Sequence, residues 1–147
     1  MSTPSHAPRR MTGIGRVLVI VYAILALAAT GRSFVQIVER FDQAPLAFTL
    51  SAASAVVYIL ATLDLIFARR SFWYTIAWIA ICFELVGVLV IGTLSLFRPD
   101  LFPEATVWSM FGMGYLFIPL VLPFFGLWWL ISHRPAPVVT ADPAVAS

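Results

Sequence analysis

The feature that most constrains this chain is a series of long stretches without a charged residue. A helix rises about 1.5 Å per residue, so about 20 apolar residues cross the hydrocarbon core of a bilayer. Hydrophobic residues make up 61% of the chain and charged residues 11%, too few to solvate a folded surface in water. The sequence therefore predicts an integral membrane protein. The charge-free stretches are residues 17–31, 43–63, 71–83, 85–97 and 105–132.

These stretches predict an all-α membrane protein with four transmembrane helices. Pro45 can open the second helix and Ser71 can cap the third. Short connections between antiparallel spans favour an up-and-down four-helix transmembrane bundle. The expected parts are an amino-terminal cytoplasmic tail (1–13), a transmembrane domain (14–132) with helices at about 14–40, 45–68, 71–97 and 104–132, and a disordered cytoplasmic tail (133–147).

The arginines predict the orientation of the bundle, since the chain has no lysine. Basic residues concentrate on the cytoplasmic side of a membrane protein, so both termini should be cytoplasmic, in a multi-pass protein of the cytoplasmic (inner) membrane. The first apolar run also resembles a cleavable secretory signal, and this alternative stays open. Six arginines fall on the side of the termini (Arg9, Arg10, Arg16, Arg69, Arg70, Arg134) and three on the other (Arg32, Arg40, Arg98).

Several classes of function are disfavoured by the residues present. The basic residues are spread over helix ends, so the net charge of +2 does not predict a nucleic-acid partner. Cys82 is the single cysteine, and His6 and His133 both lie in the flanks, which leaves no set of ligands for zinc, an iron–sulfur cluster or haem within the membrane. No nucleophile and base converge, and there is no glycine-rich phosphate loop. We expect a non-enzymatic protein without cofactor or metal.

Glu84 is the main candidate for a functional residue. It lies near the middle of the third predicted helix, with 13 uncharged residues on each side. A charged side chain there costs roughly 2 to 3 kcal/mol or more on insertion scales, so an ionisable residue at this depth is a functional candidate by default. The face around it is mostly small, which indicates packing against another helix. Glu84 is either a proton or cation site or a structural carboxyl paired with a neighbour.

Arg32 is the expected partner of Glu84. Sixteen residues separate Arg16 from Arg32 and 14 separate Arg70 from Glu84, so parallel helices that start at one boundary place the two side chains within about 3 Å in depth. An ion pair is therefore feasible. The alternative is that Arg32 extends to the outer interface.

The second helix carries two further polar features. Asp64 is expected to form a structural ion pair with Arg16 or Arg69. A stripe of hydroxyl groups, directed away from Asp64, indicates hydrogen bonds between helices, or alternatively a hydrated cavity. The stripe consists of Ser51, Ser54, Tyr58 and Thr62.

The fourth helix has a face of glycine, tyrosine and proline. Two prolines on it remove backbone donors and leave the carbonyls of Tyr115 and Pro119 unpaired within the helix. Those carbonyls need protein or water in a bilayer, so the face should point inward. A kinked helix beside Glu84 could form an ion or proton site, or could only shape the bundle. The face consists of Gly112, Tyr115, Pro119, Pro123 and Gly126.

Four segments carry a resemblance to a known family: GRSFVQI at 31–37, APLAFTLS at 44–51, FELVGVL at 83–89 and PLVLP at 119–123. Together they resemble a family of small, uncharacterised actinobacterial four-span integral membrane proteins. The resemblance covers roughly residues 14–131. It implies a location in the cytoplasmic membrane and no known activity.

The sequence as a whole predicts an accessory or scaffold subunit that acts through helix contacts, in a homo-oligomer or a larger membrane complex. Few water-facing residues remain for a soluble ligand-binding domain, which favours this function. The alternative is a small proton-coupled or ion-conducting transporter, in which Glu84 titrates and the broken fourth helix lines the path.

Overall fold

The computed structural model describes residues 13–67 and 70–135, and these residues form helices and loops without a strand. The predicted all-helical class is therefore confirmed. α1, α2 and α3 are each long and apolar enough to cross a membrane, and η3 with α4 is a fourth candidate only if this bent pair counts as one span. The elements are α1 (Gly13–Arg40), η1 (Phe41–Gln43), α2 (Pro45–Phe67), α3 (Ser71–Phe97), η2 (Pro99–Leu101), η3 (Ser109–Tyr115) and α4 (Ile118–Ser132), of which η1 to η3 are 3₁₀-helices.

The helix boundaries follow from local chemistry. α2 begins at Pro45, whose missing N–H costs nothing in the first turn of a helix. α3 ends at Phe97, because Pro99 cannot continue a helix and disfavours the helical conformation of Arg98 before it. The backbone N–H of Arg98 still donates to the carbonyl of Leu94 and closes the last turn.

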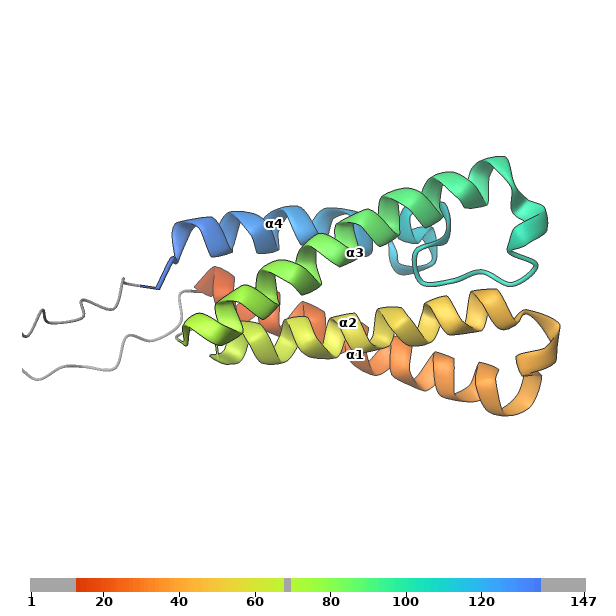
Figure 1. Cartoon of the computed structure of the whole chain (residues 1–147), viewed down its shortest axis with the longest axis horizontal. Coiled ribbons are helices and arrows are strands. Elements are labelled where there is room, and N and C mark those ends of the chain that lie inside the picture. Colours follow the sequence, from red (N-terminus) through yellow and green to blue (C-terminus); the bar gives the residue numbers. More distant parts are fainter. Residues whose placement is uncertain (1–12, 68–69, 136–147) are drawn as a thin grey trace, which may run out of the picture.

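All four α-helices run along the long axis of the molecule (Figure 1). The start of α1, the end of α2, the start of α3 and the end of α4 lie together at one end, which we call the terminal end; η1 and η2 lie at the other, the loop end. Gly15 of α1 is in close contact with α4, since a Cβ atom there would lie 3.0 Å from Nε1 of Trp129. The two ends of the described chain therefore lie on the same side.

The fourth span differs from the prediction of one helix over 104–132. Its helical part, α4, has 15 residues and is about 22 Å long, less than the roughly 30 Å of a hydrocarbon core. η3 precedes α4 at an angle of 96°. The helical conformation is interrupted before α4 by five residues with positive φ angles: Met110, Phe111, Gly112, Leu116 and Phe117. The expectation that Pro119 kinks a continuous helix was wrong, because this proline lies in the first turn of α4.

The irregular part of the fourth span is held against α2 and α3. From η2 the chain returns towards the middle of α3 (Figure 1). There the ring of Trp108 packs on Gly87, where a Cβ atom would lie only 2.9 Å from the ring. Nε1 of Trp108 donates a 3.1 Å hydrogen bond to the hydroxyl of Tyr58, and the backbone N–H of Met110 donates to Oγ of Ser95 at 2.7 Å. These contacts compensate for the helical hydrogen bonds that this segment lacks.

Candidate functional site

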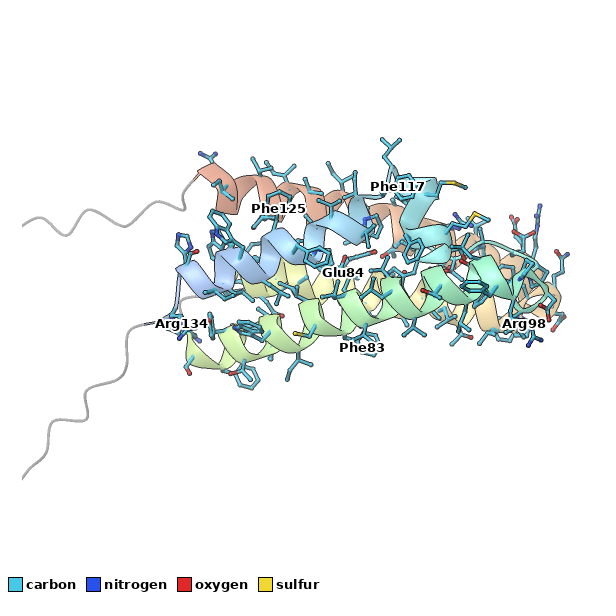
Figure 2. All side chains as sticks on the ribbon, turned by 90° about the horizontal axis from the view of Figure 1, so that it is seen from above. Phe83, Glu84, Arg98, Phe117, Phe125 and Arg134 are labelled. Carbon is cyan, nitrogen blue, oxygen red and sulfur yellow. The ribbon has the colours of Figure 1, made fainter. Side chains whose placement is uncertain are left out.

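Glu84 lies on the inner side of α3, midway along the helices, and is fully buried. Figure 2 shows its neighbour Phe83 on the outer side of the same helix. The hydroxyl of Tyr22 on α1 donates a hydrogen bond of 2.8 Å to Oε2 of Glu84. The other carboxyl oxygen, Oε1, has no hydrogen-bond partner among the described residues. A half-satisfied carboxyl in an apolar core is costly, so this unpartnered oxygen needs an explanation.

Glu84 and three aromatic residues, Tyr22, Tyr58 and Trp108, form what we call the central cluster. The rings of Tyr22 and Tyr58 are tilted against each other with centroids 6.3 Å apart. Trp108 donates to the Tyr58 hydroxyl, as described above, and contacts Phe83 edge-on at 6.2 Å. The cluster therefore joins α1, α2, α3 and the irregular segment before η3.

Helix α4 closes the central cluster through Gly126. A Cβ atom at this position would lie 2.9 Å from Cδ1 of Ile81 on α3 and 3.3 Å from the Tyr22 hydroxyl. Only glycine lets the backbone of α4 approach α1 and α3 this closely. Pro119 and Pro123 are also buried on this side of α4.

The predicted face of the fourth helix is divided between two elements. Gly112 and Tyr115 lie in η3, and the other three residues lie on α4. Gly112 has a φ of +78° and lies against the ring of Pro119, where a Cβ atom would be only 2.8 Å away. This close approach across the 96° bend needs a glycine. Four of the five residues are buried and Tyr115 is half-buried.

The expected ion pair between Arg32 and Glu84 is not formed. Nη2 of Arg32 instead donates to the backbone carbonyl of Ala105, towards the loop end. It is Tyr22, ten residues earlier on α1, that reaches Glu84. The count of residues assumed that Arg16 and Arg70 lie at the same depth, but Arg16 is already the fourth residue of α1, whereas Arg70 precedes the first residue of α3.

Asp64 is fully buried on α2, and neither of its carboxyl oxygens has a hydrogen-bond partner among the described residues. The expected pair with Arg16 is not formed within this part of the chain, where Arg98 and Asp100 form the one ion pair. Arg69, the other expected partner, lies outside the described residues.

The hydroxyl stripe of α2 mostly bonds within its own helix. Oγ of Ser54 donates to the carbonyl of Ser51, and Oγ1 of Thr62 donates to the carbonyl of Tyr58. Tyr58 alone makes the expected bond to another segment, through Trp108. The sequence interpretation missed that role, together with Tyr22 and Trp108. The available signal was that a buried tyrosine or tryptophan needs a polar partner.

The loop end carries an exposed ion pair. Arg98 and Asp100 form two hydrogen bonds, of 3.0 and 2.9 Å. The hydrogen bonds from Arg98 lower the pKa of the Asp100 carboxyl below its usual value. The described residues contain no cluster of three or more potential metal-ligating side chains.

No family model, curated protein or solved structure matches this chain. The resemblance to a family of actinobacterial four-span membrane proteins therefore stays a prediction.

Proposed function

We propose that this protein is a four-span scaffold or accessory subunit of the cytoplasmic membrane, with both termini in the cytoplasm. Three long apolar helices and one broken span support this topology, and so does the position of both ends of the described chain at the terminal end (Figure 1). Three arginines also lie at the terminal end: Arg16 near the start of α1, Arg70 just before α3 and Arg134 just after α4. This concentration of arginine is expected for a cytoplasmic side.

The observation that carries the scaffold proposal is an exposed, irregular stretch of backbone at membrane depth. Leu116 is 85% exposed, and both Leu116 and Phe117 have positive φ angles. Figure 2 shows Phe117 on the outer surface. The ring of Phe111 in the same segment packs on Gly92. Gly92 is eight residues beyond Glu84 on α3, which places it about 12 Å from the middle of the membrane if Glu84 lies there. That distance lies inside a hydrocarbon half-thickness of about 15 Å.

The backbone N–H groups of Leu116 and Phe117 donate within the bend, to the carbonyls of Met113 and Gly112. Irregular backbone at membrane depth nevertheless occurs where protein, not lipid, surrounds it, so we expect a partner to cover this stretch. An apolar groove of about 570 Å³ adjoins it between α1 and α4, bounded by Val17 and Val21 on one side and Ile118 and Val121 on the other. The occupant that we propose is a second copy of this chain. In a two-fold dimer each copy covers the same stretch of the other, so the same apolar surface both covers the partner and is covered by it.

Disulfide cross-linking in native membranes tests this dimer. Leu116→Cys in a Cys82→Ser background should give a cross-linked dimer, because a two-fold axis at this surface brings the two positions together. The matched control is the unmodified chain, whose Cys82 is exposed on α3 and should not cross-link. A monomer in both variants, together with a monomeric mass in lipid nanodiscs, would refute the scaffold proposal.

A second candidate function, a proton-coupled or ion-conducting transporter, is favoured by one observation. The unpartnered Oε1 of Glu84 lies beside a broken span, a combination that marks ion sites in transporters. Proteoliposomes with an internal pH dye would detect proton flux that Glu84→Gln abolishes and Glu104→Gln, on the loop end, leaves unchanged. Such flux would favour the transporter over the scaffold.

A further inference from the structure

Two polar groups of buried residues lack an expected hydrogen-bond partner. One is Oε1 of Glu84. The other follows from Pro123, which lies inside α4 and has no N–H, so the carbonyl of Pro119 one turn earlier has no helical donor. Both prolines are buried, so water at the surface cannot donate a hydrogen bond to this carbonyl.

The contacts between α3 and α4 bring these groups to the same level. Ile81 packs on Gly126, and the two helices run in opposite directions (Figure 1). Glu84 is three residues beyond Ile81, about 4.5 Å along α3, which corresponds to Pro123 on α4. A helical carbonyl points along the axis towards the residue four positions later, so the Pro119 oxygen points to this level.

We propose that Glu84 is a proton-binding site: it holds one proton on Oε1 and donates it to the carbonyl oxygen of Pro119. A neutral carboxyl group has one donor and can still accept through its other oxygen. Tyr22 supplies the hydrogen bond to Oε2. The bound proton therefore satisfies both unpaired groups and joins α3 to α4. This inference does not depend on the scaffold function or on a partner.

The surroundings of Glu84 favour a proton over a metal ion. The titratable groups that face it are Tyr22 from α1 and Tyr58 from α2, and α4 has no titratable residue. The described residues supply no countercharge for a carboxylate here, since Arg32 bonds to Ala105. Calcium and magnesium ions take six or more oxygen ligands, but this site offers at most the two carboxyl oxygens, the Tyr22 hydroxyl and one carbonyl. Zinc prefers cysteine and histidine ligands, and neither residue type is part of the central cluster.

Infrared difference spectroscopy of the protein in lipid at neutral pH tests the proposal. The carboxylic-acid C=O band of Glu84 is assigned by its loss in Glu84→Gln. Pro123→Ala adds an N–H that takes the Pro119 carbonyl, so Glu84 should lose its acceptor and its band should move to higher frequency. Pro45→Ala is the matched control, because it adds an N–H in the first turn of α2, at the loop end and away from Glu84, and should leave the band in place.

Thermal unfolding in detergent gives an independent readout. Glu84→Gln should unfold near the wild-type temperature, since an amide can donate to Pro119 and accept from Tyr22, whereas Glu84→Ala should unfold at a lower one. Raising the pH should destabilise the wild type as Glu84 loses its proton, and should not affect Glu84→Gln in this way. The proposal is overturned if Glu84 shows no carboxylic-acid band, if Pro123→Ala leaves the band unmoved, or if Glu84→Gln is as unstable as Glu84→Ala.

Discussion

The hydroxyl of Tyr22 donates a 2.8 Å hydrogen bond to Oε2 of Glu84 and thereby joins α1 to α3 across 62 residues of sequence. Both residues are fully buried. The bond therefore connects two elements that are not consecutive in the chain, at the point where α2, α4 and the irregular segment also meet. It is the contact from which the stability of the central cluster is best measured.

Tyr22→Phe should lower the free energy of unfolding by about 0.6 to 2 kcal/mol, the range for interhelical hydrogen bonds in membrane proteins. The change removes only the hydroxyl and leaves Oε2 of Glu84 without a donor. Reversible unfolding in mixed micelles would measure it. Tyr115→Phe is the control, since this half-buried tyrosine lies in η3 and makes no bond to Glu84. Equal losses in the two variants would contradict the role of the Tyr22 hydroxyl.

Gly87→Ala should destabilise the protein by about 1 to 3 kcal/mol, because a Cβ atom would overlap the ring of Trp108 and strain its bond to Tyr58. The same unfolding assay applies. In a Trp108→Ala background the change should cost little, since the ring is gone. Gly31→Ala has no atom within 4 Å of the new Cβ and should cause no loss. A similar loss with and without the Trp108 ring would show that the contact is not responsible.

Arg32→Gln and Glu84→Gln should have additive effects on the free energy of unfolding. The two side chains bond to different groups, Ala105 and Tyr22, and do not share a partner. A double-mutant cycle in detergent would measure the coupling. A coupling energy of about 1 kcal/mol or more would restore the ion pair expected from the sequence.

Reporter fusions should find residues 43 and 101 outside the cell, and residue 70 and the carboxyl terminus inside. This follows from the arginine distribution and from the positions of the helix ends, which lie at two opposite ends of the molecule (Figure 1). Paired fusions to a periplasmic enzyme and to a cytoplasmic fluorescent protein would read both sides. A cytoplasmic signal at residue 101 would contradict the four-span topology, and a shortened mature chain would support the cleaved-signal alternative.

Arg98→Gln should raise the pKa of Asp100 back towards its ordinary value, because the hydrogen bonds from Arg98 are the main cause of the lowered pKa. With a lowered folded-state pKa, the pair stabilises the protein above the unfolded-state pKa, and this stabilisation is lost as the pH falls through the folded value. Both side chains are 59% exposed, so the effect on stability should be small. Carboxyl NMR titration would measure the pKa. Arg40→Gln is the control, and an unchanged Asp100 pKa in Arg98→Gln would contradict the pair.

Local physics made much of this fold predictable from the sequence. Uninterrupted apolar runs and the proline at position 45 indicate where α1 to α3 lie, because these signals act within one or two helical turns. The central position of Glu84 likewise marked it as a candidate, since its depth within an apolar run can be counted from the sequence alone.

Only the tertiary structure decided what Glu84 touches and how the fourth span is built. Its hydrogen bond to Tyr22 depends on how α1 and α3 are aligned along each other, which no spacing within one helix encodes. The break before α4 depends on Gly87 and Gly92, which receive Trp108 and Phe111 from another segment. A continuous apolar run is consistent with a helix or with irregular backbone. Contacts from distant residues determine which of the two has its polar groups satisfied.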